Sequence, residues 1–163
     1  MKKYELTDET IDVSGTTLHR IKALKDFGNV KKGELGGYVE SERNLSQEGN
    51  CWVCGNAKVC GDAEVCGNAK VYGNAWVYGN AEVCGNARVY GDADYITIKG
   101  LGSKYRNTTI FRTKENIAVK CGCFYGTLAE FVDKVKETHG NSKFTKEYLA
   151  LIDLVKIHFE LEE

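Results

Sequence analysis

The sequence contains no proline and no long apolar segment. Average usage near 5% would give about eight prolines in a chain of this length, so their absence disfavours Pro-rich linkers and suits a continuous hydrogen-bonded ladder of strands. No run of residues approaches the roughly 18 apolar positions of a membrane span, and the residues after Met1 are polar where a secretory signal would be apolar. We therefore expect a cytoplasmic location and no membrane partner.

An excess of charge of one sign is also lacking, since 22 Lys and Arg side chains stand against 23 Asp and Glu side chains. The net charge of −1 excludes bulk binding of nucleic acid but permits a local patch. Residues 97–120 form such a patch, because they hold six basic side chains and a single carboxylate, Glu115. We expect an anion to bind there, with Tyr105 and Phe111 available for stacking.

A six-residue repeat occupies the middle of the chain. From Gly55 the sequence reads GNAKVC, GDAEVC, GNAKVY, GNAWVY, GNAEVC, GNARVY and GDADYI, and the same frame extends back to give ten hexads over residues 37–96. Ala and Val alternate with variable residues, which places them on the inner face of a short strand. Gly-Asn or Gly-Asp ends each strand, because Gly adopts positive φ freely and Asn and Asp tolerate it best among the rest. Strands this short must stack to bury their apolar face, which predicts a solenoid.

The hexads resemble the hexapeptide-repeat left-handed β-helix family, in which three hexads make one coil. The resemblance implies a mainly β protein built on a left-handed parallel β-helix of about ten hexads. GELGGYV at 33–39, NLSQEGNCWV at 44–53 and GCFYG at 122–126 resemble a little-characterised group of phage, prophage and bacterial β-helix proteins, which implies a bacterial host cell. Members of the wider family are commonly trimers packed through prism faces, so a homotrimer is the expected assembly.

Three hexads per coil would bring outward side chains 18 residues apart onto the same face. A basic and aromatic face carries Trp52, Cys54, Lys70, Tyr72, Arg88 and Tyr90. A mixed face carries Lys58, Cys60, Trp76, Tyr78, Asp94 and Ile96. The third face is acidic, with Glu48, Glu64, Cys66, Glu82 and Cys84. Ordered stripes of exposed aromatic side chains mark interfaces, so we expect Trp52, Trp76 and Tyr78 to form the contact between protomers.

The segments outside the hexads are expected to cap them. Residues 1–36 alternate around Ser14-Gly15, which predicts a β-hairpin that serves as an N-terminal β cap. Residues 37–98 are assigned to the β-helix, and residues 99–163 to a C-terminal cap made of a hairpin and two helices.

The C-terminal cap has recognisable element boundaries. Residues 114–116 are the expected turn of the hairpin, with Ile117, Val119, Cys121 and Cys123 on one strand face. Thr127 is the expected N-cap of the first helix, which ends at Gly140, and the second helix covers about 145–161. Both helices are expected to lie over the open end of the repeat and hide its strand edge.

The cysteines give no prediction of a metal site. Their number, seven, is odd and no secretory signal is expected, so they are interpreted as thiols. Cys51 would point inward and Cys54 outward, so this pair diverges, and Cys121 and Cys123 are expected to be buried. Cys66 and Cys84 share one face in adjacent layers, close enough for a disulfide, and whether they pair is left open.

These features favour a non-catalytic binding protein without a cofactor. Aromatic and cationic side chains together suit a base and its phosphates, and the phage resemblance suggests counter-defence. We therefore hypothesise that the protein sequesters a nucleotide-like signal in grooves of an oligomer. The expected ligand-binding residues are Lys70, Tyr72, Arg88, Tyr90, Lys104, Tyr105, Arg106 and Arg112.

Two alternatives belong to other functional classes. The protein is a module that docks a host or phage protein through its aromatic faces or through the acidic face bearing Glu48, Glu64 and Glu82, or it is an acyltransferase. The second alternative is disfavoured, because acyltransferases of the resembled family use a histidine base and the hexads contain none. The three histidines, His19, His139 and His158, all lie in the flanking segments.

Overall fold

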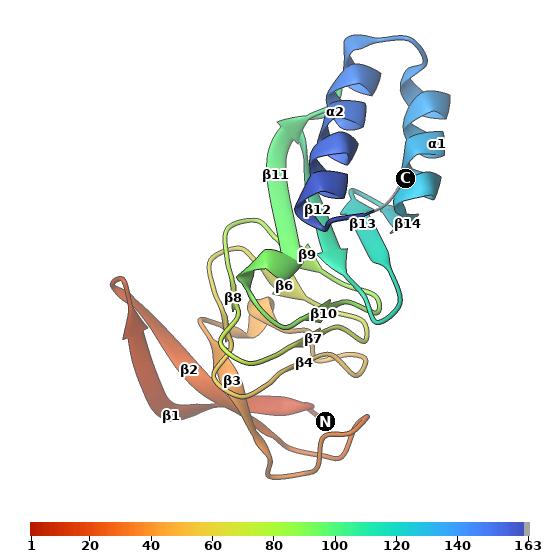
Figure 1. Cartoon of the computed structure of the whole chain (residues 1–163). Helices are drawn as coiled ribbons and strands as arrows, with labels where there is room; N and C mark the ends of the chain where they lie inside the picture. Colours follow the sequence, from red (N-terminus) through yellow and green to blue (C-terminus); the bar gives the residue numbers. More distant parts are fainter. Residues whose placement is uncertain (162–163) are drawn as a thin grey trace.

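The computed structural model describes residues 1–161, which form 14 strands and two α-helices. The N-terminal strands are β1 (Tyr4–Val13), β2 (Thr16–Ala23) and β3 (Leu35–Val39). The hexads hold β4 (Trp52–Val53), β5 (Lys58–Val59), β6 (Glu64–Val65), β7 (Lys70–Val71), β8 (Trp76–Val77), β9 (Glu82–Val83) and β10 (Arg88–Val89). The C-terminal elements are β11 (Tyr95–Leu101), β12 (Arg106–Arg112), β13 (Ile117–Cys121), β14 (Phe124–Thr127), α1 (Leu128–His139) and α2 (Lys143–His158). These three groups follow one another from bottom to top in Figure 1.

The N-terminal hairpin is confirmed. β1 and β2 are antiparallel, and the two residues between them, Ser14 and Gly15, have φ values of 51° and 86°. Asp12 Oδ1 accepts a hydrogen bond from the Gly15 N–H at 2.8 Å. Positive φ at both turn positions gives a backbone twist that matches the twist of the flanking strands. The tip of this hairpin projects away from the hexads (Figure 1).

β3 joins the hairpin to the hexads, because it pairs antiparallel with β2 and parallel with β5. Its two glycines permit a close approach of the backbones. A Cβ at Gly36 would lie 2.5 Å from the carbonyl oxygen of Val53, and a Cβ at Gly37 would overlap that of Ala57. The Gly-Gly pair of the GELGGYV segment therefore has a packing function.

The hexads place their Ala and Val side chains in the core, as the alternation predicts. Ala63 and Val65 are buried, and so are the equivalent residues of the neighbouring hexads. Each strand is two residues long and pairs in parallel with a strand 18 residues away, as in the pairing of Trp52 with Lys70 and of Lys70 with Arg88. The backbone ladder between layers is regular, with the Lys58 N–H donating to Ala75 O at 2.9 Å.

The prediction of a left-handed parallel β-helix, or solenoid, of about ten hexads is wrong. Residues 1–161 form four separate sheets instead: a mixed five-stranded sheet (β1-β2-β3-β5-β8), a three-stranded sheet (β10-β7-β4), a two-stranded sheet (β6-β9) and an antiparallel four-stranded sheet (β11-β12-β13-β14). The Gly corners divide the hexads into strands of two residues, which belong to different sheets, and antiparallel pairing takes over at both ends. The sequence repeat therefore does not extend into one closed parallel sheet.

The C-terminal hairpin is confirmed, since β12 and β13 pair antiparallel around a turn at 113–116. One face of the C-terminal sheet continues the core of the hexads through Phe111 and Ala118. The other face packs Ile110 and Val119 against the helices. The sheet, and not the helix pair, therefore covers the last hexads, which corrects the predicted position of the helices. Side chains in β12 and β13 alternate between the two faces of the sheet, so both faces carry apolar residues.

The helix boundaries agree well with the prediction. Thr127 Oγ1 accepts a hydrogen bond from the Glu130 N–H at 3.2 Å and caps α1, which ends at Gly140. α2 begins at Lys143 and buries the expected stripe from Tyr148 to Phe159. Within residues 1–161, neither helix is both long and apolar enough to cross a membrane. The proposed domain boundaries at 36/37 and 98/99 stay predictions.

Candidate functional site

A ladder of cations runs along the sheet β10-β7-β4. Lys70 and Arg88 occupy equivalent positions in β7 and β10, where their backbones pair in register. Lys70 Nζ donates to Asn50 O at 2.8 Å, and Arg88 Nη1 donates to Asn68 O at 3.0 Å. Each cation therefore reaches back to a corner carbonyl of the preceding layer. No carboxylate forms an ion pair with either side chain among residues 1–161.

A tyrosine pair lies beside the two cations. Tyr72 and Tyr90 stack with ring centroids 4.7 Å apart and an interplanar angle of 7°. Tyr90 is 56% exposed, whereas Tyr72 is half-buried. The four residues Lys70, Tyr72, Arg88 and Tyr90 form what we call the Arg88 surface. The structure thus brings half of the predicted ligand residues together, and their role in binding stays a prediction.

Two cavities adjoin the Arg88 surface, one on each side of the β12–β13 turn. They have volumes of about 510 and 560 Å³. Arg88 lines the first and Tyr90 the second, while residues 113–116 and Thr127 line both. We call these the turn cavities. Because they share the turn as a wall, an elongated ligand can contact both.

The first turn cavity brings charges of both signs together. It is lined by Arg88 and Lys114, and by Glu115 and Glu130. The Glu130 carboxylate folds over Gly126, where a Cβ would lie 2.5 Å from Oε2. Glu130 belongs to the first turn of α1. The cavity therefore holds two kinds of charged group. Its cations suit a phosphate, and its carboxylates can accept a proton.

Burial sets the electrostatics of the Arg88 surface. It lowers the pKa of Lys70, and the neighbouring Arg88 guanidinium lowers it further. Burial raises the pKa of Tyr72. A bound anion would favour the charged form of Lys70, so the surface favours negatively charged ligands.

Arg112 is the predicted ligand residue most engaged in protein contacts. Its Nε donates to Asp94 Oδ1 at 3.0 Å, and its guanidinium lies 5.2 Å from the centroid of the Phe159 ring. Arg112 thereby links β12 to the residues before β11 and to the end of α2. It also lines the second turn cavity.

The other three predicted ligand residues lie at the opposite end of β12. Lys104 and Tyr105 are in the β11–β12 turn, Arg106 begins β12, and Arg112 ends it. Lys104 and Arg106 line a third cavity of about 280 Å³, which we call the thiol cavity because Cys121 and Cys123 also line it. The eight predicted residues therefore divide between two places and do not form one site.

Of the three residues predicted to contact other protomers, Trp52 is buried, which is a correction. It is 1% exposed and packs edge-on against Phe27, with ring centroids 5.3 Å apart. The N-terminal cap covers it, which repeat spacing alone does not reveal. Trp76 is half-buried and donates from Nε1 to Cys60 Sγ at 3.1 Å, whereas Tyr78 is 52% exposed. Contact between protomers stays a prediction.

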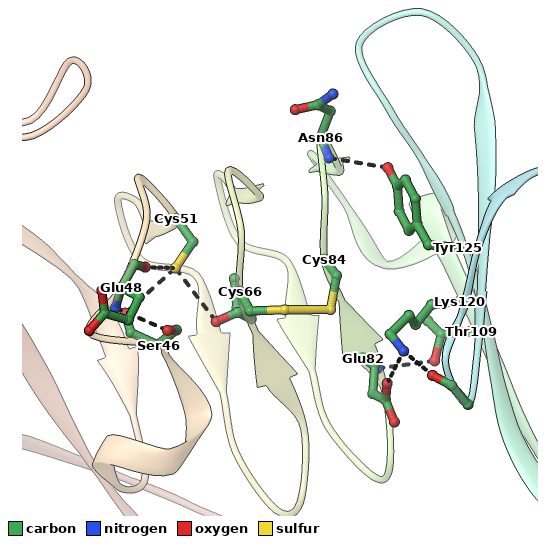
Figure 2. The surroundings of a disulfide bond; sticks show 12 residues. Ser46, Glu48, Cys51, Cys66, Glu82, Cys84, Asn86, Thr109, Lys120 and Tyr125 are labelled. Atoms are coloured by element: carbon green, nitrogen blue, oxygen red, sulfur yellow. Dashed lines mark hydrogen bonds and ion pairs between the residues drawn. A yellow bond between two sulfur atoms is a disulfide. The ribbon is translucent and has the colours of Figure 1, made fainter.

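Cys66 and Cys84 form a disulfide, with their Cα atoms 4.7 Å apart (Figure 2). This separation is normal for a disulfide and follows from the 18-residue spacing. Cys51, Cys60 and Cys121 are buried. Cys123 is exposed, which corrects the prediction that it is buried, because it lies in the turn between β13 and β14 and does not continue the strand.

The acidic face is partly covered by the C-terminal sheet. Lys120 Nζ lies 3.6 Å from Glu82 Oε2, and the Glu82 N–H donates to Thr109 Oγ1 at 3.0 Å (Figure 2). Glu64 and Glu48 remain exposed. Since Glu82 is compensated within the chain, the face is less acidic than its sequence suggests.

Sequence reasoning missed Glu115, Tyr125 and Glu130 as candidate site residues, and it included Lys114 only as part of the basic segment 97–120. Tyr125 Oη accepts a hydrogen bond from the Asn86 N–H at 3.3 Å and so joins β14 to a hexad corner (Figure 2). The sequence predicted the turn that holds Lys114 and Glu115, and it predicted the start of the helix that holds Glu130. It did not predict that these residues lie near Arg88. None of the three histidines lines a turn cavity, and His139 lines the thiol cavity.

No family model matches the chain. The chain is similar to "Uncharacterized acetyltransferase YdcK" of Escherichia coli (strain K12), with 39% identity over 61 residues. The matched region is 32% of this chain and 19% of that protein, so the chain corresponds to under a fifth of its relative. This similarity supports a relationship to hexapeptide-repeat proteins at a coarse level. The narrower resemblance to a phage group stays a prediction.

The same similarity corrects the expectation that the protein is not an enzyme. That relative is named an uncharacterized acetyltransferase, and the match covers 32% of this chain. The hexads contain no histidine that could act as a base for acyl transfer. Carboxylates also serve as general bases, and the structure places two of them in the first turn cavity.

Proposed function

We propose that the protein takes part in acyl transfer and binds the nucleotide end of an acyl-coenzyme A donor at the Arg88 surface and the turn cavities. The observation that carries this proposal is the adjacency of a stacking surface, two cations that form no ion pair within residues 1–161, and two adjoining cavities. The similarity to an acetyltransferase supports this choice of ligand. That similarity does not support sequestration of a nucleotide-like signal. The expected ligand is instead a substrate that carries a nucleotide, acyl-coenzyme A.

The chemistry of the donor matches the residues present. Adenine is flat and stacks on aromatic rings, and Tyr90 presents an exposed ring beside Arg88. The phosphates need positive charge, which Arg88 and Lys114 supply. Coenzyme A is long, so two cavities that share a wall suit it better than one closed pocket.

Glu130 is the proposed general base for the transfer step. An acceptor amine or hydroxyl gives its proton to the Glu130 carboxylate and attacks the thioester carbonyl carbon. The new C–N or C–O bond forms, the C–S bond breaks, and coenzyme A leaves as a thiolate that takes up a proton. This role requires the pantetheine arm to fold back, so that the thioester lies beside Glu130 in the cavity whose Arg88 and Lys114 bind the phosphates.

Titration calorimetry with acetyl-coenzyme A tests the binding part of the proposal. Arg88→Ala should weaken affinity about tenfold, the cost of one charge-assisted hydrogen bond. Arg43→Ala is the matched control, because Arg43 is an exposed arginine that pairs with Asp62 at 2.9 Å in another part of the hexads. Absence of binding to the unmodified protein, or equal losses in the two variants, would contradict the proposal.

Release of coenzyme A in the presence of ethanolamine tests the catalytic part. Glu130→Gln should lower the rate and leave acetyl-coenzyme A affinity unchanged, whereas Glu137→Gln, at an exposed position of the same helix, should change neither. A Glu130→Gln protein with the unmodified rate would remove Glu130 from the mechanism.

The predicted homotrimer also remains a proposal. Tyr78 is the exposed member of the three expected contact residues and packs against Trp76, with ring centroids 4.8 Å apart and planes inclined by 41°. Analytical ultracentrifugation of the unmodified protein and of Tyr78→Ala tests it. A trimer that dissociates in the variant supports this contact, and a monomer in both excludes it.

A further inference from the structure

The thiol cavity lies at the end of the C-terminal sheet opposite the turn cavities. Four elements form it: the β11–β12 turn, the β13–β14 turn, the second half of α1 and the ring of Tyr148 from α2. Its volume of about 280 Å³ is below the usual range for drug-sized ligands, so it suits a small organic molecule.

The charged side chains that line this cavity are all basic. Lys104, Arg106 and Lys134 contribute to the lining, and no carboxylate does. Lys104 and Arg106 form no ion pair among residues 1–161, and Lys134 has only Glu137 at 4.0 Å. The first turn cavity, by contrast, contains two carboxylates. An anion in the thiol cavity would therefore meet attraction from the lining, while the neighbouring carboxylates of Glu137 and Glu147 lie outside the lining.

The opposite wall is apolar and aromatic. The Phe124 and Phe131 rings have centroids 5.3 Å apart, and Phe131 meets Tyr148 edge-on at the same separation. Tyr148 Oη donates to Leu101 O at 3.3 Å, which fixes the ring against the β11–β12 turn. The wall is therefore ordered and can receive a flat ring.

Arg106 is held across the β13–β14 turn. Gly122 has a φ of 60°, and a Cβ there would overlap the Arg106 guanidinium. The glycine thus lets the side chain lie along the mouth of the cavity, where its planar fork can bind a carboxylate through two hydrogen bonds.

We propose that the thiol cavity binds a small aryl carboxylate. The ring packs against Phe131 and Tyr148, and the carboxylate pairs with Arg106, assisted by Lys104 and Lys134. A free inorganic anion would leave the aromatic wall unused, and a neutral aromatic molecule would leave the cations unpaired. This site is independent of the proposed acyl donor site, so either can fail without the other.

Backbone amide NMR with sodium benzoate tests the proposal, with benzyl alcohol and acetate as matched probes. Benzoate should produce saturable shifts at 103–106 and 121–124, and each control should bind at least about tenfold more weakly. No saturable shift with benzoate at millimolar concentrations, or equal binding of benzyl alcohol, would overturn the proposal.

Variants and thiol chemistry give a second readout. Arg106→Gln should weaken benzoate binding about tenfold, while Lys146→Gln, exposed on α2 and outside the cavity, should leave it unchanged. Benzoate should also slow iodoacetamide modification of Cys123, which is exposed and lines the cavity, relative to Cys54 in the hexads. Equal modification rates with and without benzoate would contradict occupancy of this cavity.

Discussion

Tyr72 and Tyr90 lie face to face, with ring centroids 4.7 Å apart and planes inclined by 7°. They are 18 residues apart and follow Lys70 and Arg88, whose strands pair in register. The repeat therefore sets the stack, because equivalent positions of successive layers face the same direction. Tyr90 is the more exposed ring and is the one available to a ligand.

Replacing Tyr90 tests whether this exposed ring takes part in binding. Tyr90→Ala should weaken acetyl-coenzyme A binding at least about fivefold, because stacking on an aromatic side chain contributes roughly 1–3 kcal/mol per base. Tyr90→Phe keeps the ring and should bind nearly as the unmodified protein does. Calorimetry measures both affinities. If the alanine and phenylalanine variants bind equally well, stacking at Tyr90 is excluded.

Lys3 should be essential to the N-terminal cap. Its buried ammonium donates to Glu48 O at 3.3 Å and to Cys51 O at 2.9 Å, and burial lowers its pKa. Lys3→Met leaves these carbonyls unsatisfied and should lower the free energy of unfolding by about 2 kcal/mol.

Lys2→Met is the matched control for Lys3→Met. Lys2 is 60% exposed and pairs with Glu42, so its loss should cost under about 0.5 kcal/mol. Urea denaturation monitored by circular dichroism measures the free energies of unfolding. Equal costs in the two variants would show that the buried hydrogen bonds do not stabilise the cap.

The disulfide should stabilise the hexads. Its sequence separation of 18 residues predicts a loss of about 3 kcal/mol on removal, through the entropy of the unfolded chain. Cys66→Ser/Cys84→Ser should therefore unfold at lower urea concentration than the oxidised protein. A reducing agent should destabilise the unmodified protein and leave the double variant unchanged. Equal unfolding midpoints with and without reductant would mean that the bond does not stabilise the fold.

The protein should lose stability at alkaline pH. Burial raises the pKa of Tyr95 from 10.0 to about 12 and that of Tyr148 likewise to about 12. A tyrosine whose pKa is raised on folding holds its proton more tightly in the folded state. Its contribution to the free energy of unfolding is complete below about pH 10 and is lost as the pH rises toward 12.

Tyr95→Phe isolates one of these contributions, because phenylalanine does not ionise. Its free energy of unfolding should be lower at neutral pH, where the hydrogen bond from Tyr95 Oη to Trp76 O at 2.8 Å is lost. Its decline from pH 10 upward should be shallower than that of the unmodified protein. Parallel declines in urea titrations across this range would show that Tyr95 titrates normally in the folded chain.

Local sequence patterns predicted the elements that local chemistry determines. Ser14-Gly15 marks a hairpin turn and Thr127 a helix cap, because their backbone or side chain makes the turn within a few residues. The Ala and Val alternation likewise identified the core of the hexads. The overall architecture was not predictable in the same way, since antiparallel pairing at both ends depends on which distant strands meet.

The candidate site is formed by residues that are distant in the sequence, so it was only partly predictable. Arg88 and Tyr90 share a strand and its corner, so the repeat was enough to place them side by side. Lys114 and Glu130 reach Arg88 only through the packing of the C-terminal sheet, which no spacing reveals. For Trp52, a distant contact hides a residue that the repeat predicts to be exposed. Its hexad position points outward, but the N-terminal cap buries it.

Hydrogen–deuterium exchange with and without saturating acetyl-coenzyme A tests the central claim most directly, because it shows where the donor binds. The account predicts slower exchange at 86–90 and 113–116, with no change at 103–106. Protection confined to 103–106 and 121–124, or no protection anywhere, would contradict the assignment of the acyl donor to the Arg88 surface and the turn cavities.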